Sequence, residues 1–169
     1  MFPHFARLER HFVSDRSSQD QSNGEPVARC SWSRTFTVSA RPDVVADVRR
    51  QVALLARKLP FTDQDIEDVK LAVGEAVTNA IKHGSPLGER NRVTMHCEQI
   101  GERFVVEIHD EGPGFDLESR ICRTPDHCAE DGRGLYFMEQ LMDGVSVRKG
   151  SGAVVRLEKL VRVPAIVSE

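Results

Sequence analysis

Polar side chains recur at helical spacing in residues 75–84, which read EAVTNAIKHG. Glu75 and Asn79 are four residues apart, so they stack on one face of a helix, and Lys82 and His83 continue that face. A carboxylate can accept a proton from a hydroxyl nucleophile, and an amide oxygen is a hard ligand for Mg²⁺ beside phosphate oxygens. The spacing favours a metal and phosphate site. A solvated helix face with a Glu–Lys ion pair is the alternative that spacing alone leaves open.

A second motif, DEGPGFD at residues 110–116, directly follows an alternating apolar segment. Asp110 could accept a hydrogen bond from the exocyclic amine of adenine. Gly112 and Gly114 let the backbone approach a flat ligand or adopt a positive φ. Taken alone, the motif is better explained by a Gly-Pro turn that the aspartate side chain caps.

A third motif, GRGLYF at residues 132–137, places glycines at the start of a helix. Free backbone N–H groups at Gly132, Arg133 and Gly134, together with the helix dipole, would attract phosphate. A Gly-x-Gly before a helix is weak evidence by itself, because it often marks only the end of a loop.

The apolar pattern predicts the elements that hold these motifs. Pro42 suits the first turn of a helix that ends near Pro60, and Thr62 suits the N-cap of the next helix. We expect Gly84 to close that second helix in a left-handed conformation. Period-two alternation predicts strands at 34–38, 92–99, 104–109, 145–148 and 153–160, and a last helix at 135–142.

The order of these elements predicts an α+β fold, a two-layer sandwich of a mixed, mostly antiparallel sheet with helices on one face. The compact domain should occupy residues 34–163. Residues 1–33 form an N-terminal extension that is partly flexible, because 14–26 are almost free of apolar side chains, and 164–169 form a tail. The long loop 110–131 suggests function rather than simple connection.

Composition excludes several classes of protein. The net charge of -3 gives no general attraction to nucleic acid or to an anionic membrane. No apolar run approaches the roughly 20 residues that span a bilayer, and residues 1–15 do not form a secretory signal. Four scattered cysteines among 169 residues do not make a disulfide scaffold, so we expect a cytoplasmic protein. Cys122, His127 and Cys128 lack a fourth ligand and the usual spacing of a zinc site.

Together the three motifs, in this order and with these gaps, resemble the Bergerat-fold nucleotide-binding domain of the GHKL superfamily. The resemblance runs from about Arg34 to Val161. The chain is too short for the histidine-kinase, gyrase or MutL architectures, which need further domains. It is most similar to the bacterial anti-sigma-factor serine/threonine kinases, especially in LAVGEAVTNAIKHGSP and MEQLMDGVSV.

This resemblance implies that the protein binds ATP and Mg²⁺ and phosphorylates a serine or threonine of a STAS-type antagonist protein. It also implies that the protein sequesters a sigma factor and forms a homodimer. Glu75 would be the general base, Asn79 would ligate Mg²⁺, and Lys82 and His83 would lie near the phosphates. One alternative is a module that holds its partner with little phosphoryl transfer. The other is a kinase for an antagonist that is unrelated to sigma factors.

The other motifs acquire roles through the same resemblance. Asp110 would contact the adenine amine, Gly112 and Gly114 would shape the base pocket, and residues 116–131 would form a lid. The segment that would line the nucleotide comprises Gly132, Arg133, Gly134 and Leu135, and the arginines available for the γ-phosphate are Arg120, Arg123 and Arg133.

One position departs from the family pattern. Ala153 stands where the family often has a threonine whose hydroxyl supports the adenine contact, so we expect Asp110 to lack that helper. Weaker ATP binding, or a water in place of the hydroxyl, would follow.

Overall fold

The protein is described here by a computed structural model that covers residues 30–113 and 133–162. Its first half comprises β1 (Cys30–Ser39), the 3-10 turn η1 (Pro42–Val44), α1 (Val45–Ala56), α2 (Asp63–Lys82) and the 3-10 turn η2 (Gly88–Arg90). Its second half comprises β2 (Arg92–Ile100), β3 (Arg103–His109), α3 (Arg133–Leu141), β4 (Gly144–Lys149) and β5 (Ala153–Leu160). This is the element order that the apolar pattern predicts.

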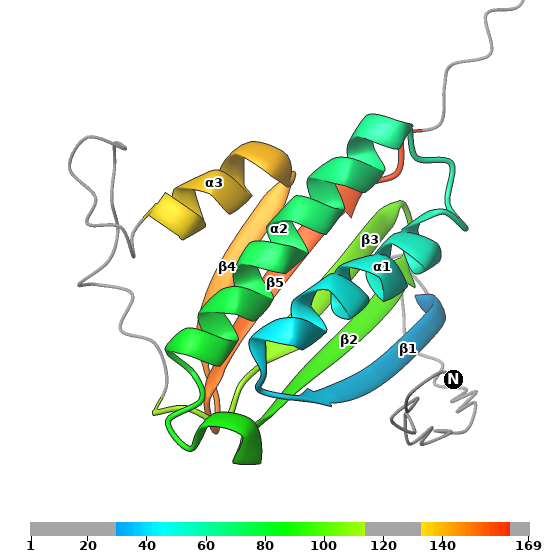
Figure 1. The fold of residues 1–169 in the computed structure, drawn as a ribbon. Coiled ribbons are helices and arrows are strands. Elements are labelled where there is room, and N and C mark those ends of the chain that lie inside the picture. Colours follow the sequence, from blue (N-terminus) through cyan, green and yellow to red (C-terminus); the bar gives the residue numbers. More distant parts are fainter. Residues whose placement is uncertain (1–29, 114–132, 163–169) are drawn as a thin grey trace, which may run out of the picture.

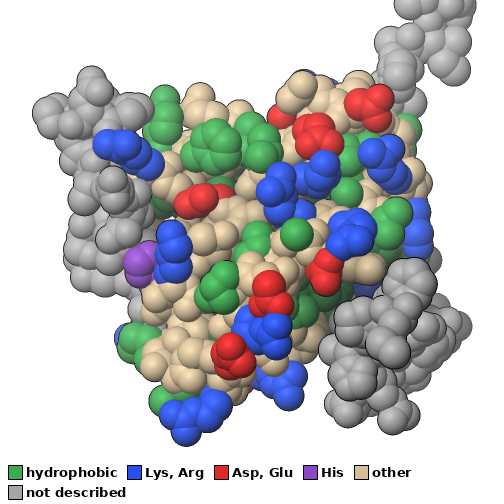
Figure 2. Space-filling view, viewed as in Figure 1, with side chains coloured by type: hydrophobic (Ala, Val, Ile, Leu, Met, Phe, Trp, Pro, Cys, Tyr) green, Lys and Arg blue, Asp and Glu red, His purple; other side chains and the backbone are tan. Residues whose placement is uncertain are grey.

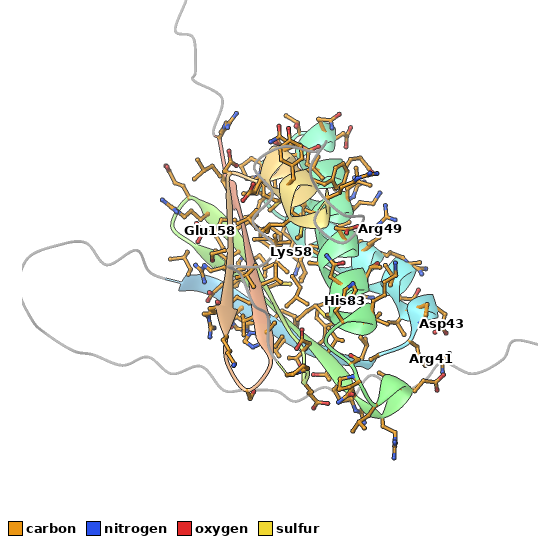
Figure 3. The ribbon with its side chains drawn as sticks, turned by 90° about the vertical axis from the view of Figure 1, so that its left-hand side faces the viewer. Arg41, Asp43, Arg49, Lys58, His83 and Glu158 are labelled. Carbon is orange, nitrogen blue, oxygen red and sulfur yellow. The ribbon has the colours of Figure 1, made fainter. Side chains whose placement is uncertain are left out.

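The five strands form one sheet in the order β1-β2-β3-β5-β4, and each pair of neighbouring strands is antiparallel. All three helices lie on the same face of this sheet, which gives two layers (Figure 1). The view in Figure 3 shows the helical layer beside the sheet, with His83 near the carboxyl end of α2. The predicted α+β sandwich is confirmed, although the described strands contain no parallel pair.

The start of α2 follows the rules of helix capping. The side chain of Thr62 accepts from the backbone N–H of Asp65 at 3.1 Å, and the Thr62 N–H donates to the Asp65 carboxylate at 3.0 Å. This reciprocal capping box satisfies two N–H groups that helix geometry leaves without partners. The predicted N-cap is therefore correct, and it sets the register of the face that carries Glu75 and Asn79.

The end of α2 differs from expectation. Gly84 does not adopt a left-handed conformation, since the positive-φ glycines of the described chain are Gly88 and Gly101. His83 closes the helix in a right-handed conformation instead. A glycine stands at position 84 for another reason, because a Cβ there would lie 2.2 Å from the carboxylate of Asp110.

Other boundaries move as well: the helix predicted to end near Pro60 ends at Ala56, and the one predicted at 135–142 spans Arg133–Leu141. The first strand begins at Cys30, four residues before the predicted start. The helix predicted from Pro42 is divided into η1 and α1, because its first turn has 3-10 geometry. None of these differences changes the apolar face that packs on the sheet.

The core lies between the sheet and the helices. Val73 and Val77 of α2 are fully buried against the inward strand residues Met95, Phe104 and Leu157. Trp32 and Cys97 belong to this packing, as their sequence pattern indicates. The opposite, outer surface of the helices mixes basic and acidic side chains (Figure 2).

No helix of the described chain is long and apolar enough to cross a bilayer.

Candidate active site

The first turn of α3 lies directly on the polar face of α2. Glu75 and Asn79 are half-buried there. A Cβ added to Gly134 would lie 2.3 Å from Glu75 Oε1 and 3.0 Å from Asn79 Nδ2. The missing side chain at Gly134 thus allows a helix N-terminus to approach a carboxylate and an amide. The structure brings together two motifs that are about sixty residues apart in sequence.

Lys82 and His83 occupy the other end of the same face. Both are exposed, and the backbone N–H of His83 donates to the Asn79 carbonyl at 2.8 Å. They lie at the carboxyl end of α2, so a chain of polar groups runs from Glu75 to the helix terminus. The close approach of Gly134, however, involves Glu75 and Asn79.

Asp110 follows the last residue of β3 and is held in one orientation. Its Oδ1 accepts from the backbone N–H of Gly112 at 3.0 Å and of Ala153 at 2.9 Å. Its own N–H donates to the Ala153 carbonyl at 3.1 Å. No described residue donates to the second oxygen, Oδ2. That oxygen therefore keeps its capacity to accept from a ligand amine.

Three glycines surround Asp110 so closely that a side chain would not fit. A Cβ on Gly84 would lie 2.2 Å from Asp110 Oδ2, and one on Gly152 would lie 2.0 Å from the Asp110 carbonyl oxygen. A Cβ on Gly112 would lie 2.7 Å from the Cα of Gly84. Sequence reasoning assigns no site role to Gly84 or Gly152. The available signal is that Gly152 immediately precedes Ala153, the position compared with the family pattern.

Ala153 supports Asp110 through its backbone rather than through a hydroxyl. The N–H of Ala153 donates to the Asp110 carboxylate, and the Ala153 carbonyl accepts from the Asp110 N–H. Alanine has no hydroxyl with which to support the aspartate. The two backbone bonds nevertheless fix the aspartate without it.

Arg133 and Leu135 belong to the first turn of α3. Arg133 is exposed, while Leu135 is half-buried and packs against the hydrophobic core. A nucleotide contact by Leu135 would therefore use its backbone. Several predicted positions lie outside the described residues: Gly114, Gly132, Arg120, Arg123, Cys122, His127, Cys128 and the lid 116–131.

A magnesium site of the expected kind is compatible with these residues. Residues 30–113 and 133–162 contain no group of three acidic, histidine or cysteine side chains that could hold a metal alone. Mg²⁺ bound to a nucleotide does not need one, since it usually keeps waters and takes one or two protein ligands beside phosphate oxygens. The half-buried amide of Asn79, next to the carboxylate of Glu75, suits that limited role.

The N-terminus of α3 faces an acid and an amide, and a fixed carboxylate lies at the end of strand β3. This arrangement is suited to binding a nucleotide. The chain belongs to the histidine kinase-like ATPase domain family, whose model matches residues 38–159.

Its relatives identify the branch. The serine-protein kinases RsbW of Bacillus velezensis and Bacillus subtilis are each 35% identical to it over 130 residues, covering 72% of this chain and 81% of theirs. RsbW of Listeria innocua is 32% identical over 135 residues, covering 75% of this chain and 86% of its own. The predicted superfamily, its kinase branch and the prediction of a protein serine/threonine kinase are thereby confirmed.

A solved structure shares the fold. The RsbU and RsbW domains of Rv1364c from Mycobacterium tuberculosis match with a TM-score of 0.60 and 20% identity. The match covers 80% of this chain and 34% of that one, so this chain spans about a third of the solved protein.

Proposed function

We propose that this protein is an ATP-dependent serine/threonine kinase and anti-sigma factor. It phosphorylates a STAS-type antagonist protein and sequesters a sigma factor when the antagonist is phosphorylated. The observation that carries the proposal is the approach of Gly134 to Glu75 and Asn79, 2.3 Å and 3.0 Å from an added Cβ.

Glu75 is the general base of this proposal. Its carboxylate accepts the proton of the substrate hydroxyl as that oxygen forms a bond to the γ-phosphorus of ATP and the bond to ADP breaks. Phosphoryl transfer needs mainly positioning and neutralisation of charge, so a base, a metal ion and one cation suffice. The half-buried position of Glu75 suits a group that must meet substrate and nucleotide at once.

Asn79 and the start of α3 hold the phosphates. The amide oxygen of Asn79 is one ligand for Mg²⁺, which neutralises phosphate charge when bound. The first-turn N–H groups of α3, around Gly134, donate to phosphate oxygens, and the helix dipole favours negative charge there. Lys82 and His83 add positive or polar groups at the end of α2.

Asp110 selects the base. Oδ1 is occupied by two backbone N–H groups at 3.0 Å and 2.9 Å, so Oδ2 is the oxygen that accepts from the adenine amine. Guanine carries a carbonyl at the corresponding position and would leave the carboxylate facing another acceptor. ATP should therefore bind more tightly than GTP.

The partners and setting belong to the same proposal. The substrate is the STAS antagonist, the sequestered protein is a sigma factor, and the kinase works as a homodimer in the cytoplasm without contacting nucleic acid or membrane. Sedimentation of the purified protein with and without ATP tests the dimer. A single species of monomer mass would contradict the proposed homodimer.

The kinase step is tested with labelled ATP and a purified STAS-domain antagonist protein. Glu75→Ala and Glu75→Gln should retain nucleotide affinity within about twofold and lose phosphoryl transfer by about 10²-fold or more. Glu67→Ala, which removes an exposed carboxylate of the same helix paired with Lys70, is the matched control and should transfer normally. Unchanged transfer in both Glu75 variants would defeat the assignment of the base.

The alternatives give different results in the same experiments. If the protein only sequesters its partner, the wild-type chain would bind a sigma factor in a pull-down experiment. It would transfer no phosphate to any STAS protein. A kinase unconnected to sigma would transfer phosphate and capture no sigma factor.

A further inference from the structure

A buried amide ties the loop after α2 to the loop that carries Asp110. Asn91 is 5% exposed, and its Oδ1 accepts from the backbone N–H of Leu87 at 2.7 Å. Its Nδ2 donates to Glu111 Oε2 at 3.0 Å, and its carbonyl accepts from the N–H of Ala40 at 3.0 Å. The side chain of Asn91 therefore joins the residue before η2 to the loop after β3, and its backbone carbonyl binds the residue after β1.

Glu111 completes this connection from the other side. The same oxygen, Oε2, also accepts from the backbone N–H of Arg92 at 2.8 Å. The hydrogen bond from Asn91, followed by that from Arg92, lowers the pKa of Glu111 below its ordinary value. The carboxylate is therefore charged at neutral pH, and bonds from N–H groups to a charged acceptor are the stronger kind.

The connection reaches the candidate base pocket through its neighbours in sequence. Glu111 lies between Asp110 and Gly112, and the backbone of Gly112 packs against Gly84 so closely that an added Cβ would lie 2.7 Å from the Gly84 Cα. Gly84 in turn faces the Asp110 carboxylate. Movement of residues 110–112 away from the loop that ends at Asn91 would therefore displace Asp110 Oδ2.

We propose that Asn91 and Glu111 are positioning residues that set nucleotide affinity and base selectivity by fixing Asp110, without touching the nucleotide. The inference rests on the proposed role of Asp110 in reading adenine. The proposed role of Asn91 and Glu111 does not involve the phosphates. Its loss should therefore change recognition of the base and leave phosphoryl transfer intact. A shift of the acceptor oxygen by about an ångström weakens a directed hydrogen bond strongly, whereas the phosphate contacts are assigned to other residues.

Glu111→Ala tests this inference, because the side chain is exposed and its removal leaves no cavity. Binding of ATP and GTP is measured by titration calorimetry, and steady-state kinetics are measured with the antagonist protein. We expect ATP affinity to fall about tenfold and the ATP-to-GTP preference to shrink by a similar factor, while kcat at saturating ATP stays within about twofold. A purely structural loss would lower the melting temperature and leave the nucleotide preference unchanged.

Two variants provide controls. Glu111→Gln keeps an oxygen where both donors converge on Oε2, so it should restore nearly normal affinity and preference. Glu89→Ala removes an exposed carboxylate from η2, in the loop that ends at Asn91, and this variant should bind ATP like the wild type.

Asp110→Asn distinguishes failure of this inference from failure of the proposed function. If Asp110→Asn binds ATP normally, the proposed reading of adenine is wrong. If Asp110→Asn loses ATP while Glu111→Ala retains both its affinity and its preference for ATP over GTP, the positioning role of Asn91 and Glu111 is overturned.

Discussion

Gly134 of α3 faces the carboxylate of Glu75 on α2 so closely that a methyl group on its Cα would lie 2.3 Å from Oε1. The contact joins the helix that would bear the base to the helix whose N-terminus would hold phosphate. It can be disturbed by the smallest possible substitution.

Gly134→Ala should lower kcat by about 10- to 100-fold, because the added methyl displaces the Glu75 carboxylate from its position. The free energy of unfolding should not fall. The clash is with the far end of a flexible side chain, and alanine is favoured over glycine in a helix by about 1 kcal/mol. Steady-state kinetics and thermal unfolding check both parts, and a variant with normal kcat would show that the position of Glu75 is not limiting.

Gly152→Ala should destabilise the fold by about 1–3 kcal/mol and abolish ATP binding, because its Cβ would meet the Asp110 carbonyl at 2.0 Å and this clash is with backbone. Gly150→Ala, in the same turn, is the control, since its Cβ would make only an ordinary contact of 3.6 Å with Val154. Urea unfolding and ATP titration compare the two. Equal behaviour of the two variants would contradict the steric argument.

Lys159→Met should lower the free energy of unfolding by about 3–5 kcal/mol. Lys159 is 8% exposed, and its Nζ donates to Asp68 of α2 at 3.0 Å and to the carbonyl of Leu141 at the end of α3 at 2.7 Å. Its removal would leave the helix-end carbonyl without this donor and the half-buried carboxylate of Asp68 without its cation, with only Gln64 among the described side chains still donating to that carboxylate at 2.8 Å. Denaturant unfolding measures the change.

Lys70→Met is the comparison for that measurement. Its partner Glu67 is half exposed, so the loss should be no more than about 0.5 kcal/mol. Similar losses in the two lysine variants would mean that the buried position of Lys159 has no special effect.

Lowering the pH should destabilise the fold by protonating Glu107 and Glu158 on the sheet. Burial tends to raise the pKa of Glu107, but hydrogen bonds from Arg156 and His109 outweigh it, so the pKa lies below its ordinary value of 4.5. The hydrogen bond from Arg156 likewise lowers the pKa of Glu158. A folded pKa below the unfolded one adds stability that is complete above about pH 4.5 and is lost as pH falls through the folded value.

Urea unfolding at a series of pH values from 7 downward measures that loss. Glu107→Gln should flatten the dependence below about pH 4.5, because the group that binds the proton is absent. A pH profile identical to that of the wild type would show that Glu107 does not contribute.

Cys97 should be unreactive in the folded protein. Burial raises the pKa of its thiol to about 12, so almost no thiolate is present at pH 8. In a variant with serine at the other three cysteines, a thiol reagent should react only as fast as the protein unfolds. Rapid labelling under native conditions would contradict the burial of Cys97 against the core.

The sequence predicts the order of the elements because local signals agree with the tertiary packing. Thr62 is the N-cap that its residue type predicts, and the apolar stripe of α2 is buried as its spacing requires. The prediction that Gly84 closes α2 in a left-handed conformation is wrong. A glycine after a helix usually indicates a left-handed cap, whereas here the residue is small because Asp110 approaches from a distant strand end.

The contributions of Gly152, Asn91 and Glu111 could not be predicted from local pattern. Each acts through a contact with a residue far away in sequence, and no spacing rule links Ala153 to Asp110 or Asn91 to Glu111. A buried asparagine and a glycine in a turn look ordinary when their partners are unknown.

The sequence alone determines which side chains share the polar face of α2, because helical periodicity places Glu75 and Asn79 together whatever the other elements do. Only the tertiary structure decides that Gly134 lies against them and that Asp110 has one oxygen bonded and the other available. Those relationships depend on how the sheet and helices pack, which local propensity does not encode.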